Sequence, residues 1–243
     1  MKSIAKLSLL LIALVVSGCK DNSVDPEELK TFIPLKTGNY WLYMNYSLNA
    51  DGTGEIPDLW KFGFIIDGSV SLLNGEKNTL HYKLFTCGEK LKPYYDKPGT
   101  FKGSKLIYQG RDGFYYSGIE KNDTIKMSFN DLIFPYPTEK GRTVQGHIFY
   151  YESTGSPFNI PDSLITEYTC VSTDSLITTP SGEFRCIVYK MAYFDIEPLF
   201  RDEVYYFIKP EVGIVAMVGM VYHYKTQKYS YMDKTLLTDY KIN

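Results

Sequence analysis

Residue types that could do chemistry are sparse in this chain, and none falls into a catalytic spacing. The three histidines are His81, His147 and His223, and none forms a His-x-x-x-His or His-Glu-x-x-His pair. Such pairs place two imidazoles on one helix face to hold zinc, so we expect no zinc site. Each histidine is expected to lie on a strand surface or to be satisfied by hydrogen bonds within the fold. Two Ser-x-x-Lys pairs begin at Ser3 and Ser17, at the N-terminal end. A serine nucleophile of the penicillin-binding type is therefore not indicated.

Two further patterns approach known sites without completing them. Asp-Ser-Leu-Ile-Thr occurs at 162–166 and at 174–178 and resembles the serine block of one esterase class, without its preceding glycine. We interpret the two copies as parts of neighbouring strands. The stretch from Asn49 to Gly54 approaches the start of a calcium loop, but the twelfth position, which should be a bidentate Glu, is Trp60. We therefore predict no metal, no cofactor and no enzymatic activity.

The N-terminal stretch carries the strongest signal. Lys2 and Lys6 give the start of the chain a positive charge. An apolar run from Leu7 to Val16 follows, interrupted only by Ser8. A helix of this length is too short to span about 30 Å of hydrocarbon, and the layout is that of a secretory signal peptide. We predict a signal-peptide helix over residues 1–18.

The apolar run ends in Val16-Ser17-Gly18-Cys19, which resembles the lipobox of bacterial lipoproteins. The resemblance implies cleavage after Gly18, a thioether-linked diacylglycerol on the Cys19 sulfur and an acyl chain on the new amino group. Each buried CH2 adds about 0.8 kcal/mol, so two or three chains hold a protein on a membrane. The alternative is a plain signal peptide with Cys19 at its boundary.

The residues after Cys19 bear on the membrane and on the partners. Lys20-Asp21 resembles a surface-export signal of some Gram-negative groups, and we expect the outer membrane, on its periplasmic or surface face. Residues 19–30 are polar and charged and are predicted to form a flexible tether. Loss of residues 1–18 leaves four more acidic than basic side chains. A nucleic-acid-binding protein would show a basic stripe instead, so no nucleic acid is expected as a partner.

The rest of the chain predicts strands. Aromatic residues make up 16% of it, with 22 Tyr and 14 Phe, and these residue types favour strands. Turn signals such as Asp67-Gly68 and Asn74-Gly75 separate short alternating runs, and only the stretch over 196–202 suggests a short helix. We predict one mainly antiparallel all-β domain over 31–243, either a curved sheet or half-barrel or a sandwich.

That domain opens with Pro34-Leu35-x-x-Gly38-x-x-Trp41, which resembles a motif at the N-terminus of many uncharacterised Gram-negative lipoproteins. Some of their relatives are similar to the periplasmic lipoprotein carriers, in which a curved antiparallel sheet forms an open half-barrel around a lipid. The resemblance implies such a fold here. Because Pro-x-x-x-Gly recurs at 137–141, we also predict two similar halves, 31–133 and 134–243.

After lipidation of Cys19, three cysteines remain: Cys87, Cys170 and Cys186. The last two flank a predicted hairpin turn, and tight pairing around it would set Cys170 opposite a residue near Met191. A disulfide between them would need a bulge or another register. We expect small buried hydrophobes and leave the pairing open.

Adjacent tyrosines occur at 94–95, 115–116, 150–151 and 205–206. Because neighbours on a strand point to opposite faces, they either fill a two-faced sheet or form a binding face for lipid or glycan. We predict a non-enzymatic, lipid-anchored lipoprotein of the cell envelope that binds a hydrophobic ligand or an envelope protein. The alternatives are a structural or assembly subunit of a surface complex and a glycan-binding accessory protein. The sequence assigns no ligand-binding residues.

Overall fold

A computed structural model describes residues 31–48, 54–71, 78–87, 103–121, 124–149, 163–193, 203–223 and 225–243. Within these ranges every regular element is a β-strand, and the prediction of an antiparallel all-β fold is confirmed. The predicted signal-peptide helix, the lipidation site Cys19, the tether and the stretch 196–202 lie outside these ranges.

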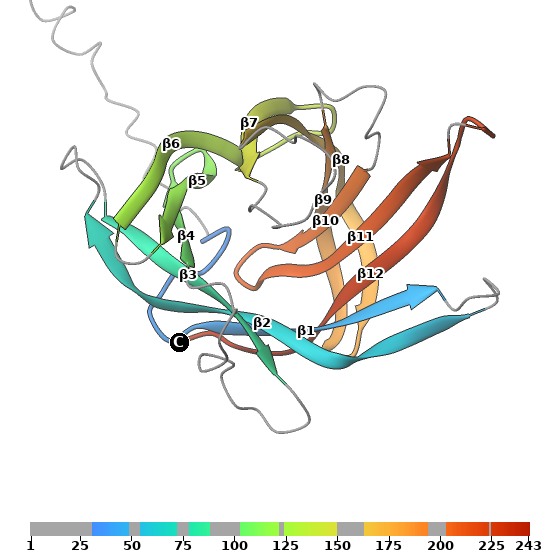
Figure 1. The fold of residues 1–243 in the computed structure, drawn as a ribbon, viewed down its shortest axis with the longest axis horizontal. Coiled ribbons are helices and arrows are strands. Elements are labelled where there is room, and N and C mark those ends of the chain that lie inside the picture. Colours follow the sequence, from blue (N-terminus) through green and yellow to red (C-terminus); the bar gives the residue numbers. More distant parts are fainter. Residues whose placement is uncertain are drawn as a thin grey trace, which may run out of the picture. The chain divides into compact units, whose positions relative to one another are not determined.

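The strands of the described residues join into one antiparallel sheet (Figure 1). In the sheet the order is β6-β5-β4-β3-β2-β1-β12-β11-β10-β9-β8-β7, so the chain enters and leaves the sheet at its middle. The strands are β1 (Tyr40–Leu48), β2 (Glu55–Ser71), β3 (Asn78–Cys87), β4 (Gly103–Gly110), β5 (Gly113–Lys121), β6 (Thr124–Pro135), β7 (Thr143–Phe149), β8 (Ser163–Thr179), β9 (Gly182–Tyr193), β10 (Glu203–Lys209), β11 (Gly213–His223) and β12 (Lys228–Lys241).

The sheet is open, yet its two edges approach one another. Its edge strands, β6 and β7, follow one another along the chain, and no ladder joins them among the described strands. They nevertheless pack together. Gly146 of β7 lies so close to Ile133 of β6 that a Cβ atom placed on it would stand 3.1 Å from Cγ2 of Ile133. Figure 1 shows the strands curling around an interior. The fold is therefore a single curved sheet and not a sandwich of two sheets.

Strand alternation decides which tyrosines point into this interior. On β5, Tyr116 is buried while its neighbour Tyr115 is half-buried and hydrogen-bonded to an exposed aspartate. On β10, Tyr206 points inward, and Tyr205 bonds to a glutamate on its own strand. Each pair thus divides between the two faces of the sheet. The pairs at 94–95 and 150–151 lie outside the described residues.

The motif residues before β1 form the predicted turn. Gly38 has a φ of 88°, a conformation that favours glycine. Its N–H donates to the Ile66 carbonyl at 2.8 Å, and the Ile66 N–H donates to the Asn39 carbonyl at 2.9 Å. Within the turn, the Asn39 N–H donates to Lys36 at 3.0 Å, and Asn39 Nδ2 donates to the Pro34 carbonyl at 2.7 Å. The turn is therefore fixed to β2.

The second Pro-x-x-x-Gly segment repeats this set of bonds before β7. Gly141 has a φ of 91° and donates to the Cys170 carbonyl at 2.7 Å, while the Cys170 N–H donates to Arg142 at 2.9 Å. The Arg142 N–H donates to Glu139 at 3.2 Å, and Arg142 Nη1 donates to the Pro137 carbonyl at 3.0 Å. The two turns are equivalent in hydrogen bonding. The division into two similar halves stays a prediction.

Two local predictions are wrong because strands continue past the turn signals. Asp67-Gly68 lies inside β2, where the ladder to β3 shifts register between Ile66 and Gly68. The extra residue forms a bulge instead of a hairpin turn. The two Asp-Ser-Leu-Ile-Thr copies run along a single strand, β8, from Ser163 onward, and not along neighbouring strands. The turn signal Asn74-Gly75 lies outside the described residues.

Cys170 and Cys186 are buried and carry free thiols. Cys170 lies opposite Tyr189, two positions from the predicted Met191, because the ladder between β8 and β9 shifts register twice between Cys170 and Ser175. Cys186 lies opposite Ser175. The two cysteines are therefore the small buried hydrophobes that we expected, and the disulfide alternative is wrong.

Candidate functional site

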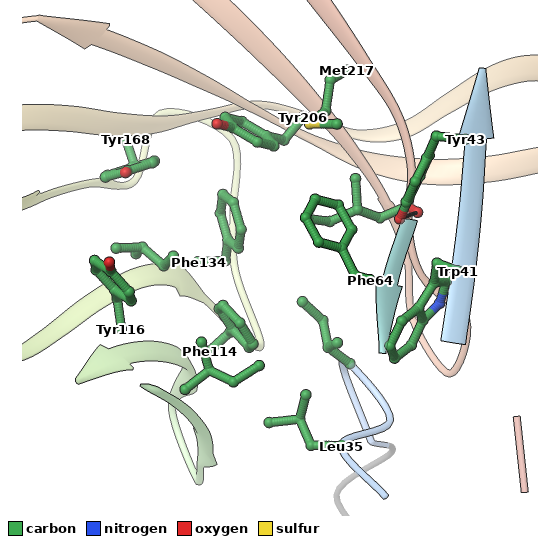
Figure 2. Close-up of a pocket in the computed structure, with 14 residues that line it drawn as sticks. Leu35, Trp41, Tyr43, Phe64, Phe114, Tyr116, Phe134, Tyr168, Tyr206 and Met217 are labelled. Carbon is green, nitrogen blue, oxygen red and sulfur yellow. Dashed lines mark hydrogen bonds between the residues drawn. The ribbon is translucent and has the colours of Figure 1, made fainter. Parts of the chain in front are cut away.

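An apolar cavity of about 150 Å³, partly open to solvent, lies on the inner face of the curved sheet (Figure 2). Its described lining comes from strands across the sheet and from the residues that precede β1. The lining residues are Ile33, Leu35, Trp41, Tyr43, Phe64, Ile107, Phe114, Tyr116, Ile133, Phe134, Tyr168, Tyr206, Ile214 and Met217.

Phe134 of the lining packs against three other aromatic residues of the lining and against Tyr189, and we call these rings the aromatic wall. The Phe134 ring centroid lies 5.9 Å from that of Phe114, 5.7 Å from Tyr168, 5.1 Å from Tyr189 and 5.3 Å from Tyr206. Figure 2 shows Phe134 between Tyr206 and Phe114. Such pairs contribute about 0.5–1.5 kcal/mol each beyond burial. The aromatic wall is therefore held in place by contacts among its own rings.

The polar atoms of Trp41 and Tyr43, in the part of the lining across from Phe134, already have hydrogen-bond partners in the backbone. Trp41 Nε1 donates to the Val212 carbonyl at 2.6 Å, and the Tyr43 hydroxyl donates to the Ile214 carbonyl at 2.8 Å. Burial raises the pKa of the Tyr43 phenol, so the ring stays neutral. These two side chains therefore present their ring faces to the cavity, and their hydrogen-bond donors are already occupied.

One part of the lining does not belong to the sheet. We call residues Thr31–Leu35 the strap. Phe32 is fully buried; its ring stacks on Tyr136 at 4.5 Å and meets Tyr189 edge-on at 6.3 Å. Ile33 is also buried, and it lines the cavity together with Leu35. Burial of a Phe or Ile side chain stabilises by about 1.5–3 kcal/mol, so the strap packs as part of the core.

Groups that could bind a metal do not cluster in the part of the chain that the structure describes. There, no three His, Cys, Asp or Glu side chains gather as metal ligands would. His223 is exposed, and its Nε2 lies 2.6 Å from the Ser230 hydroxyl. His81 and His147 lie on β3 and β7. Asn49, where the calcium-like stretch begins, is outside the described residues.

Membrane-spanning helices are also absent from the ranges that the structure describes, because no helix there has the length and apolar character that a bilayer crossing requires.

Sequence reasoning named no ligand-binding residue, although it singled out several that line the cavity. Leu35 and Trp41 belong to the N-terminal motif, and Tyr116 and Tyr206 belong to the tyrosine pairs. The aromatic composition could therefore point to a binding face. The aliphatic members, such as Ile107 and Ile133, carry no signal that distinguishes them from other core residues.

One comparison with a solved structure supports the fold. No family model matches the chain, and no curated protein matches it. One similar solved structure, from Bacteroides fragilis NCTC 9343, is named as an exported protein with a YmcC-like fold. It superposes with a TM-score of 0.50 at 15% identity, over 87% of this chain and 99% of its own. A second structure, named as a lipoprotein from Parabacteroides distasonis ATCC 8503, gives a TM-score of 0.49 at 14% identity. The match covers 88% of this chain and 100% of that one.

Proposed function

We propose that this protein is an exported lipoprotein of the cell envelope, held to the outer membrane through lipid on Cys19, that binds an apolar ligand without transforming it. The observation that carries the ligand proposal is the cavity, whose described lining consists of aromatic and aliphatic side chains. The lipobox-like sequence supports the anchor. The similar structure from Bacteroides fragilis is named as an exported protein, which agrees with export.

The size of the cavity limits the occupant. A cavity of about 150 Å³ lined by Leu, Ile and Phe can bind benzene or xenon, whereas pockets for drug-sized ligands measure about 300–1,000 Å³. The volume here therefore suits a single ring or the end of a hydrocarbon chain. A whole lipid would need a larger space.

The chemistry of the lining argues against the glycan alternative. Buried sugar hydroxyls need hydrogen-bond partners, and the described lining contains no carboxylate, amide or basic group. The same lining holds no His, Cys, Asp, Glu, Lys, Ser or Thr side chain, the commonest sources of a general acid, a general base or a nucleophile, and its titratable groups are tyrosine hydroxyls. Binding without catalysis is therefore the function that this site supports best.

The anchor would keep the cavity near the membrane. Eleven residues lie between Cys19 and Thr31, and the twelve Cα-to-Cα steps that they span reach at most about 40 Å. The ligand could therefore pass between the bilayer surface and the cavity. A Cys19→Ser variant should lose membrane attachment and keep the folded domain.

Native mass spectrometry of the lipidated full chain, purified from a Gram-negative host, tests the proposal. Wild type should carry an added apolar molecule that is lost on denaturation. Met217→Trp, which fills the cavity, should lose it. Val218→Trp is the matched control, because Val218 is the half-buried neighbour of Met217 on β11 and is absent from the described lining. A clean apo mass for wild type, or equal retention by Met217→Trp, would contradict the proposal.

A further inference from the structure

We propose that the strap, Thr31–Leu35, is a gate that swings away from the sheet and admits apolar molecules larger than the closed cavity holds. This inference rests on the proposed function, because it concerns access to the same cavity. It assigns a role to the segment that joins the folded domain to the tether.

The first observation is the place of the strap in the lining. Among the described lining residues, Ile33 and Leu35 alone come from outside the sheet. Every other described lining residue lies on a strand that hydrogen-bonded ladders hold on one or both sides. The strap can therefore leave without breaking a strand pairing, whereas no other part of the described wall can.

The second observation is how unevenly the strap is held. At its N-terminal end, the Thr31 carbonyl accepts one hydrogen bond of 2.9 Å, from the Glu211 N–H. At its C-terminal end, the Pro34 carbonyl is bonded to Asn39, and Gly38 is bonded to β2. The turn is thus a fixed pivot, and release of the other end requires Phe32 and Ile33 to leave the core.

The third observation is what the strap covers. Phe32 inserts its ring against Tyr136 and Tyr189, and Tyr189 in turn packs on Phe134 of the cavity wall. When Phe32, Ile33 and Leu35 leave, the cavity gains the space that their side chains occupy.

A reversible cross-link tests the gate. Thr31→Cys and Glu211→Cys, made together in a Cys87→Ser background, join the strap to the turn between β10 and β11. Both positions are exposed, whereas Cys170 and Cys186 are buried. The full chain is compared in its oxidised and reduced forms with two probes. Benzene fits the closed cavity, and N-phenyl-1-naphthylamine, with three rings, requires an open one.

The two probes separate the two proposals. Benzene should bind both forms equally, which also shows that the oxidised form is folded. N-phenyl-1-naphthylamine should bind the reduced form and lose at least about tenfold in affinity on oxidation, since a locked gate removes the competent population. Equal binding of the larger probe to both forms would overturn the gate alone. Failure of benzene to bind either form would overturn the proposed function and the gate together.

A second variant decides the matter if the cross-link does not form. Phe32→Ala removes the stack on Tyr136 and should raise the apparent affinity for N-phenyl-1-naphthylamine about tenfold through a larger open population. Phe184→Ala is the control, because Phe184 is a half-buried aromatic packed on Tyr240 and is absent from the described lining. An unchanged or lower affinity in Phe32→Ala, or an equal rise in the control, would overturn the gate.

Discussion

The indole of Trp41 donates its N–H to the Val212 carbonyl at 2.6 Å, across 171 residues of sequence. The next residue, Gly213, lies against the same ring, so that a Cβ atom placed on it would stand 3.1 Å from Nε1. This contact fixes the turn between β10 and β11 to the start of β1. It joins two distant parts of the sequence at one wall of the cavity.

Gly213→Ala should therefore lower the free energy of unfolding by about 2–3 kcal/mol. The φ of 105° strains any L-residue, and the added methyl displaces Trp41 from its hydrogen bond. Gly141→Ala is the matched control, because Gly141 has a φ of 91° but a Cβ atom placed on it would meet no atom within 4 Å. Urea denaturation should show a loss at least about 1 kcal/mol larger for Gly213→Ala. Equal losses would mean that the Trp41 contact contributes nothing.

Asn39→Ala should destabilise the domain by about 2–3 kcal/mol. Asn39 is fully buried, donates to the Pro34 carbonyl at 2.7 Å, and accepts at Oδ1 from the Asn243 backbone N–H and Nδ2 at 2.9 and 3.1 Å. Its loss leaves buried groups without partners. Arg142→Ala, at the equivalent position of the second turn, removes an exposed bond and should cost less than about 1 kcal/mol. Thermal unfolding of both variants checks the difference, and the reverse order would contradict it.

The two buried thiols should resist alkylation in the native protein. Burial raises the pKa of the Cys186 thiol to about 12 and also raises the pKa of Cys170. For Cys186, the shift from 9.0 reduces the reactive thiolate about a thousandfold at neutral pH. Iodoacetamide labelling followed by peptide mass spectrometry should find both cysteines unmodified until guanidinium unfolds the chain. Rapid labelling of native Cys186 at pH 7 would contradict the buried placement.

Tyr115 should make stability depend on pH in the alkaline range. Burial and the 2.8 Å hydrogen bond from its hydroxyl to Asp112 raise its pKa from 10.0 to about 12. A raised folded-state pKa means that the stabilisation is complete below pH 10 and is lost as the pH rises from 10 to 12. Urea midpoints across this range should fall less steeply in Tyr115→Phe than in wild type. Parallel slopes would exclude the contribution.

The sequence predicted the parts of the fold that depend on local patterns. Aromatic and β-branched alternation indicated the strands, and Pro34 with Gly38 marked the turn that the structure contains. Asp67-Gly68 gave a wrong prediction of a hairpin turn, because a bulge and a hairpin turn use the same residue types. The choice between them depends on the pairing of β2 with β3, which no local window contains.

The cavity could not be predicted because it depends on the curl of the whole sheet. Phe114 and Ile214 line one space although 100 positions separate them in sequence. Alternation indicates that each faces inward, but the distance between the two inner faces follows from strand order. The aromatic pairs suggested a binding face, and only the topology shows which member of a pair lines the cavity.

The most direct test of an apolar ligand cavity is a crystal structure of the protein under xenon pressure. Xenon enters dry cavities of about this volume. We predict an anomalous peak enclosed by Trp41, Phe134 and Tyr206 in wild type, and its absence in Met217→Trp. Ordered water filling the space in place of xenon would contradict the central claim, because a site that water prefers is not one built for an apolar ligand.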